Sequence, residues 1–195
     1  MSTTTEPATD RIREFVLAGH GNLALVQERL AADPALLNAA YEWRENDRET
    51  ALQAAAHVGN RAIAEYLLAQ GAPLHICTAA MLGRQAEVER LVADDPSQID
   101  AKGAHGISLL THAALSGNVA LAQWLVAHGA RSGMSAALHN AVSQGHADLT
   151  FWLLQHGDPD VEWKNFEGKT ALTVATERGL EPIAQLLRAH GASEA

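Results

Sequence analysis

Residues 106–118 read Gly-Ile-Ser-Leu-Leu-Thr-His-Ala-Ala-Leu-Ser-Gly-Asn, and residues 168–179 read Gly-Lys-Thr-Ala-Leu-Thr-Val-Ala-Thr-Glu-Arg-Gly. Both stretches place a short apolar segment, which contains alanine, in front of a second glycine. Apolar residues follow that glycine after four and eight residues, which is the spacing of one buried face of a helix. Each stretch therefore predicts a unit of two helices, in which small side chains on the first helix let the second approach closely.

The same arrangement occurs six times along the 195 residues. The glycines that end the first helix of each unit, called anchor glycines here, are Gly21, Gly59, Gly83, Gly117, Gly145 and Gly179. Alternate anchor glycines are 62 residues apart, except that Gly59 and Gly117 are 58 apart. The segment 39–49 is four residues longer than the matching segment 101–107. We therefore expect three blocks of two units, with an insertion in the loop of the first block.

These units resemble the ankyrin repeat, whose pattern is Gly-x-Thr-Pro-Leu-His-x-Ala, then Gly, then a Leu-rich helix that ends in Gly-Ala, with a period of about 33 residues. Residues 50–59 and 67–72 also match, and the resemblance extends over about residues 10–192. It implies an all-α fold, an ankyrin-repeat solenoid of stacked antiparallel helix pairs with projecting finger loops. The proline and histidine of the pattern are replaced, for example by Ala51 and Gln53, so the turn before each helix pair keeps only part of its usual chemistry.

The repeat also predicts the domain organisation. Residues 1–8 are expected to be a flexible segment, and residues 9–195 a single domain of six repeats. Glycines expected to close second helices in a left-handed conformation are Gly71, Gly129, Gly157 and Gly191. Where Asp-Pro replaces this glycine, an extra helical turn is expected at 34–37 and 96–99. Long finger loops are expected only in the even units, at 38–49, 100–107 and 161–169.

Composition excludes several classes of function. The formal net charge is −9 with only three lysines, so binding to nucleic acid is not expected. The chain has no run of 18 apolar residues and its start lacks the features of a secretory signal, so we expect no membrane association and a cytoplasmic location. The single cysteine, Cys77, cannot form an internal disulfide and is expected to be a small buried residue.

The resemblance implies that the chain binds another protein through its finger loops and through the two variable positions before each anchor glycine. The candidate partner-binding residues are Tyr41, Trp43, Arg44, His57, Val58, Met81, Leu82, His105, Ile107, Leu115, Trp163 and Phe166. Four of them form either an exposed apolar ladder or ordinary packing, namely Val58, Met81, Leu82 and Leu115.

The aromatic residues fall into two groups. Trp43 and Trp163 lie in finger loops and either face solvent or cover the base of the next repeat. Trp124 and Trp152 share the helical register of Tyr66, seven residues after their anchor glycines. A position that is aromatic in three units is expected to be a packing position.

Catalytic motifs are absent from the sequence. Residues 19–24 match a loose dinucleotide pattern, but the repeat register explains this stretch. His128, His156 and His190 are aligned in consecutive units, whose helices are too far apart for a shared metal ion, so they are expected to bind carbonyls at helix ends. Acidic residues are assigned to solvated faces. We therefore expect no enzyme activity, no cofactor and no metal ion.

Two alternative functions stay open. A pocket between the fingers, around His57, His105 and His112, could hold a small ligand or support catalysis. The apolar residues could instead support self-association, although a monomer is expected.

Overall fold

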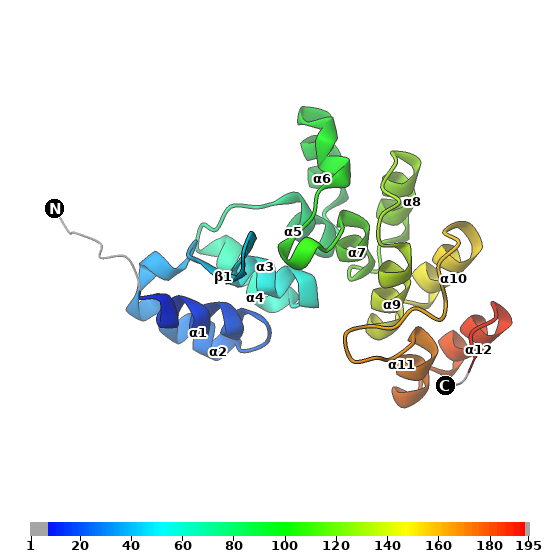
Figure 1. The fold of residues 1–195 in the computed structure, drawn as a ribbon. Helices are drawn as coiled ribbons and strands as arrows, with labels where there is room; N and C mark the ends of the chain where they lie inside the picture. Colours follow the sequence, from blue (N-terminus) through cyan, green and yellow to red (C-terminus); the bar gives the residue numbers. More distant parts are fainter. Residues whose placement is uncertain (1–7, 194–195) are drawn as a thin grey trace.

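The helices are arranged in pairs, as the repeat predicts. The computed structural model of the chain describes residues 8–193 (Figure 1). The first helices of the six pairs are α1 (Thr9–Gly19), α3 (Ala51–Val58), α5 (Ile76–Met81), α7 (Leu109–Ala114), α9 (Met134–Gln144) and α11 (Ala171–Glu177). The second helices are α2 (Leu23–Ala32), α4 (Arg61–Ala69), α6 (Gln85–Asp94), α8 (Val119–Ala127), α10 (Ala147–His156) and α12 (Glu181–Ala189). Each first helix contacts the first helix of the next pair, which confirms the all-α solenoid.

Side-chain caps explain where several helices begin. The Thr50 hydroxyl accepts a hydrogen bond from the backbone N–H of Gln53 at 3.2 Å, and the Gln53 side chain accepts one from the N–H of Thr50 at 2.9 Å. Ser108 and Thr170 also accept hydrogen bonds from the third residue of α7 and α11. These residues occupy the threonine position of the repeat pattern, because a hydroxyl there satisfies an N–H that the helix itself leaves unpaired.

Most turns use glycine as expected. Gly59, between α3 and α4, has a φ of 77°, which residues with a Cβ rarely adopt. The closing glycines Gly71, Gly129 and Gly191 also have positive φ. The expectation for Gly157 is wrong, because its φ is −102° and Asp158 takes the left-handed conformation instead. A Cβ at Gly157 would lie 2.6 Å from Sδ of Met134, so this glycine allows close packing against α9.

Two connections between helix pairs contain the short helical turns that the sequence predicts. The 3-10 turns η1 (Pro34–Leu36) and η2 (Pro96–Asp100) confirm the extra helical turns after the Asp-Pro pairs. In each turn the aspartate side chain accepts a hydrogen bond from the backbone N–H two residues later.

The first finger is a β-hairpin, which the sequence did not predict. Strands β1 (Ala40–Arg44) and β2 (Asp47–Thr50) pair in antiparallel fashion, with Tyr41 opposite Glu49. Asn46 forms the turn with a φ of 64°. The four additional residues of this loop give the hairpin its length. It contacts α1 and the second finger, which contains the 3-10 turn η3 (Ala104–Gly106).

The core consists of two clusters of buried side chains, one within the first pairs and one extending from α5 to α12. Met81 and Leu82 are only 2% and 5% exposed and belong to the first cluster. Leu115 is half-buried against the same cluster, and Val58 alone is exposed. Of the two alternatives, ordinary packing therefore holds for Met81, Leu82 and Leu115, because their side chains contact the cluster of the first pairs.

The aromatic packing positions are confirmed. Trp124 and Trp152 pack against the larger cluster, and Tyr66 packs against the smaller one. No helix within residues 8–193 is long and apolar enough to cross a membrane. Residues 1–7 of the expected flexible segment lie outside the described residues.

Candidate functional site

The first finger carries three candidate residues on β1. Tyr41 and Trp43 are half-buried, and their rings meet edge to face with centroids 4.8 Å apart. Arg44 is exposed, and its Nε donates to Oδ2 of Asp47 at 3.1 Å. The indole of Trp43 donates to Glu49 at the base of the hairpin, so this tryptophan covers the repeat and does not project from it.

The third finger holds its aromatic residues differently. Oδ1 of Asn165 accepts hydrogen bonds from the N–H groups of Glu167 and Lys169, both at 3.0 Å, and so closes a tight turn. Phe166 lies in this turn and is 97% exposed. The Trp163 ring is 38% exposed, and its other side meets His139 edge to face. The turn therefore presents Phe166 almost entirely to solvent.

A carboxylate is buried at the base of the first finger. Glu49 on β2 is 0% exposed. Its Oε2 accepts a hydrogen bond from Nε1 of Trp43 at 2.7 Å, whereas Oε1 has no well-directed donor among the described residues. Burial alone would raise the pKa of Glu49, but the polar contacts of His57 and Trp43, together with the nearby His20, hold the pKa below its ordinary value. Glu49 is therefore charged at neutral pH.

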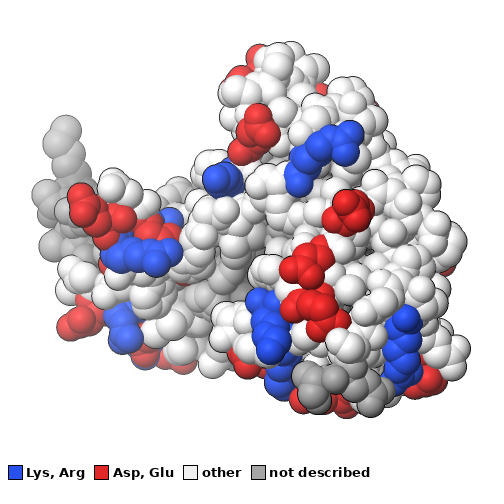
Figure 2. Space-filling view, turned by 45° about the vertical axis from the view of Figure 1, so that its right-hand side comes forward, with Lys and Arg blue, Asp and Glu red and all other residues white. Residues whose placement is uncertain are grey.

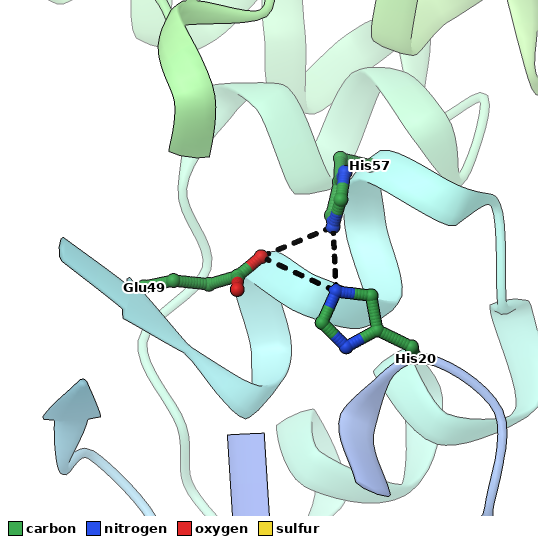
Figure 3. A group of neighbouring side chains, drawn as sticks. All are labelled: His20, Glu49 and His57. Carbon is green, nitrogen blue, oxygen red and sulfur yellow. Dashed lines mark hydrogen bonds and ion pairs between the residues drawn. The ribbon is translucent and has the colours of Figure 1, made fainter. Parts of the chain in front are cut away.

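Three histidines surround this carboxylate (Figure 3 shows two of them). Nε2 of His57, at the end of α3, lies 3.0 Å from Oε1 of Glu49. Nε2 of His20, which follows α1, lies 3.8 Å from the same oxygen and 3.0 Å from Nε2 of His57. Nε2 of His105 in the second finger lies 3.5 Å from Oε1. Three Nε2 atoms from three separate elements thus face one carboxylate oxygen.

Hydrogen bonds on the far side of the rings orient two of these histidines. Nδ1 of His20 donates to the backbone oxygens of Val16 and Leu17, at 3.2 and 3.3 Å. Nδ1 of His105 lies 3.0 Å from Oδ2 of Asp47. This contact, together with the hydrogen bond from the His105 N–H, holds the pKa of Asp47 below its ordinary value. A proton on each Nδ1 leaves the lone pair of each neutral ring on Nε2, which faces Glu49.

A separate hollow of about 470 Å³ lies between α5, η2 and the second finger. His112 and Cys77 line it. Burial lowers the pKa of His112 to about 4, and burial raises the pKa of the Cys77 thiol to about 12. The thiol is therefore protonated at neutral pH and gives no thiolate nucleophile. Of the three histidines predicted to share a pocket, only His112 lines this hollow, while His57 and His105 belong to the group around Glu49.

Comparison with known families agrees with the fold. A model of three consecutive ankyrin repeats matches residues 110–194, and a model of a single ankyrin repeat matches residues 47–79. The chain belongs to the ankyrin repeat family. The nuclear factor NF-kappa-B p105 subunit of Gallus gallus is 33% identical over 103 residues, which make up 49% of this chain and 10% of that protein. The ankyrin repeat chain thus spans about a tenth of the length of this relative.

Sequence reasoning about this ankyrin repeat protein found His57 and His105 but missed Glu49 and His20. The expectation that acidic residues lie on solvated faces is wrong for Glu49, which is fully buried. One signal was available: Glu49 directly precedes Thr50, the cap of α3, and such a position lies close to the body of the repeat. His20 gave no comparable signal, since it lies 29 residues before Glu49.

The three aligned histidines, His128, His156 and His190, have the predicted role. Nδ1 of His128, His156 and His190 contacts the backbone oxygen four residues earlier, at 2.7, 3.0 and 2.8 Å. The expectation that these residues bind carbonyls at the ends of second helices is confirmed. His128 and His156 also stack on Trp124 and Trp152.

The surface of the ankyrin repeat domain carries both signs of charge. Figure 2 shows acidic and basic side chains interspersed on the face it displays, separated by wide uncharged areas. The whole chain has 14 basic and 23 acidic residues. Of the remaining candidates, Ile107 is half-buried in the second finger.

Proposed function

We propose that this ankyrin repeat protein binds a partner protein through its finger loops, with Phe166 and Trp163 of the third finger as the central contacts. Ankyrin repeats are generally protein–protein interaction modules, and this chain has their fold. The observation that carries the proposal is the 97% exposure of Phe166 in a closed turn. The partner would offer an apolar pocket that accepts the phenyl ring.

Two physical arguments support this surface. Aromatic side chains contribute a large share of the binding energy in protein interfaces, because they bury a large area with few rotatable bonds. The hydrogen bonds of Asn165 order the turn before binding, so less conformational entropy is lost in the complex. In the first finger, by contrast, Trp43 is engaged by Glu49, and Arg44 remains the exposed candidate.

The test compares two exposed phenylalanines. The variant Phe166→Ser removes the ring from the third finger, and the matched control Phe151→Ser removes a 49% exposed ring from α10. Each purified protein is used as bait in extracts of the source cells, and captured proteins are identified by mass spectrometry. We expect one partner to be captured by the wild type and by Phe151→Ser but lost with Phe166→Ser. If Phe166→Ser captured the partner as well as the wild type does, the third finger would not be part of the interface.

A further inference from the structure

We propose that His20, Glu49 and His57 form a binding site for a divalent transition-metal ion, with Zn²⁺ as the best match. The three ligand atoms all lie within 4.8 Å of one another. They come from the end of α1, from β2 and from α3, and they point toward one another in Figure 3. Imidazole nitrogen and carboxylate oxygen are donors that zinc commonly takes in proteins. The site is independent of the proposed partner surface on the third finger.

The spacing of the three atoms fits a single ion. Nε2 of His57 lies 3.0 Å from Nε2 of His20 and 3.0 Å from Oε1 of Glu49, and the third side of the triangle is 3.8 Å. Zinc bonds of about 2.0–2.1 Å at tetrahedral angles separate two ligand atoms by about 3.3 Å. The observed distances lie on both sides of this value. Movements of about half an ångström or less would therefore bring all three atoms to bonding distance.

The hydrogen bonds behind the His20 ring also favour a cation at Nε2. The hydrogen bonds of Nδ1 of His20 to backbone oxygens leave the lone pair of the neutral ring on Nε2. Metal-bound histidines typically donate their other ring N–H to a carbonyl or carboxylate in this way. The two Nε2 atoms face each other at 3.0 Å, and Oε1 of Glu49 lies 3.0 Å from that of His57. A metal ion would satisfy both nitrogens and the nearby carboxylate oxygen at once.

Glu49 gives the independent argument. Its side chain is fully buried, and within residues 8–193 no donor is well directed at Oε1. A buried carboxylate with an unsatisfied oxygen is costly unless a cation or hydrogen bonds offset the loss of hydration. The atom is aimed at the two histidine nitrogens, which is where a bound ion would lie.

A fourth position remains for water, because among the described residues only His20, Glu49 and His57 have ligand atoms that all lie within 4.8 Å of one another. Nε2 of His105 lies 3.5 Å from Oε1 of Glu49, and its Nδ1 contacts Oδ2 of Asp47 at 3.0 Å. Asp47 and His105 therefore form a pair beside the three ligands. An ion bound here would join α1, the hairpin of the first finger and α3, next to the second finger.

The experiment measures zinc binding to the full chain without a histidine tag, because a tag would itself bind the metal. Zn²⁺ is titrated in competition with a chromophoric chelator, and Co²⁺ is used in parallel because tetrahedral Co²⁺ absorbs visible light much more strongly than octahedral Co²⁺. The variants are His20→Ala, His57→Ala and Glu49→Gln. The matched control is His128→Ala, which removes an exposed histidine directly after α8. Circular dichroism and thermal unfolding show that each variant is folded.

We expect the wild type and His128→Ala to bind one Zn²⁺ per chain with equal affinity. Each ligand variant should weaken binding by more than about tenfold, since even loss of a residue that only orients a ligand weakens binding by about 10- to 100-fold. His20 is partly exposed, so its replacement tests the site even if His57→Ala or Glu49→Gln does not fold. The proposal fails if the wild type binds no zinc against the chelator, or if His20→Ala binds zinc as tightly as His128→Ala does.

Discussion

His112 should make the stability of this protein depend on pH. Its side chain is 1% exposed, and Nδ1 donates to the backbone oxygen of Ser108 at 2.9 Å. Burial lowers its pKa in the folded state from 6.5 to about 4. Between about pH 6.5 and about pH 4, His112 binds a proton in the unfolded chain but not in the folded chain. The free energy of unfolding therefore falls as the pH drops through this range. At about 1.4 kcal/mol per pKa unit, the loss reaches about 3 kcal/mol.

The assay is urea unfolding across this pH range for the wild type and for His112→Asn. Asparagine keeps a donor near Ser108 but does not titrate. The many carboxylates of the chain affect both proteins, so the difference between their free energies of unfolding isolates His112. We expect this difference to shift by about 3 kcal/mol in favour of the variant as the pH falls. A difference that stays constant from about pH 7 to about pH 4 would show that His112 titrates equally in both states.

Two further predictions concern packing. Met81→Ala should lower the free energy of unfolding by about 2–5 kcal/mol, whereas Val58→Ala should cost less than about 1 kcal/mol, because only Met81 is buried. If urea unfolding showed the same loss of free energy for Met81→Ala and Val58→Ala, Met81 would be as exposed as Val58. Gly19→Ala should destabilise the protein by about 1–3 kcal/mol or more, because its Cβ would lie 2.6 Å from the backbone oxygen of Ala51. The control is Gly21→Ala, because a Cβ at Gly21 has no atom within 4 Å. If neither variant changed the melting temperature, α1 and α3 would not approach as closely as the structure shows.

Among the candidate partner-binding residues, the position of Phe166 in its loop accounts for its exposure. Phe166 follows Asn165 in a closed turn, and a residue there projects from the fold. For Met81 and Leu82 the sequence left exposure and packing open, because they share their register with exposed positions of other units, and the structure shows that they are packed. Their side chains pack into the cluster of the first pairs, and sequence register carries no information about such neighbours.

The candidate metal site could not be predicted from the sequence, because its residues come together only in the folded protein. From the sequence, the ligand His57 and the adjacent His105 are expected together with His112 around a pocket between the fingers, and neither Glu49 nor His20 is expected beside them. Glu49 looks like an ordinary acidic residue in a polar loop, and only the hairpin fold turns its side chain inward. The sequence contained the donors, but the distances between them depend on how three separate elements pack.

The sequence alone determined the repeat, the helix pairs and the caps that start them, because helical periodicity, threonine caps and turn glycines act over fewer than about 12 residues. The tertiary structure decided which side chains are buried and which meet. His20 and His57 are 37 residues apart in the chain, yet their nitrogens lie 3.0 Å apart. Such contacts arise from the stacking of whole units and the folding of a finger onto them, so no local pattern in the sequence encodes them.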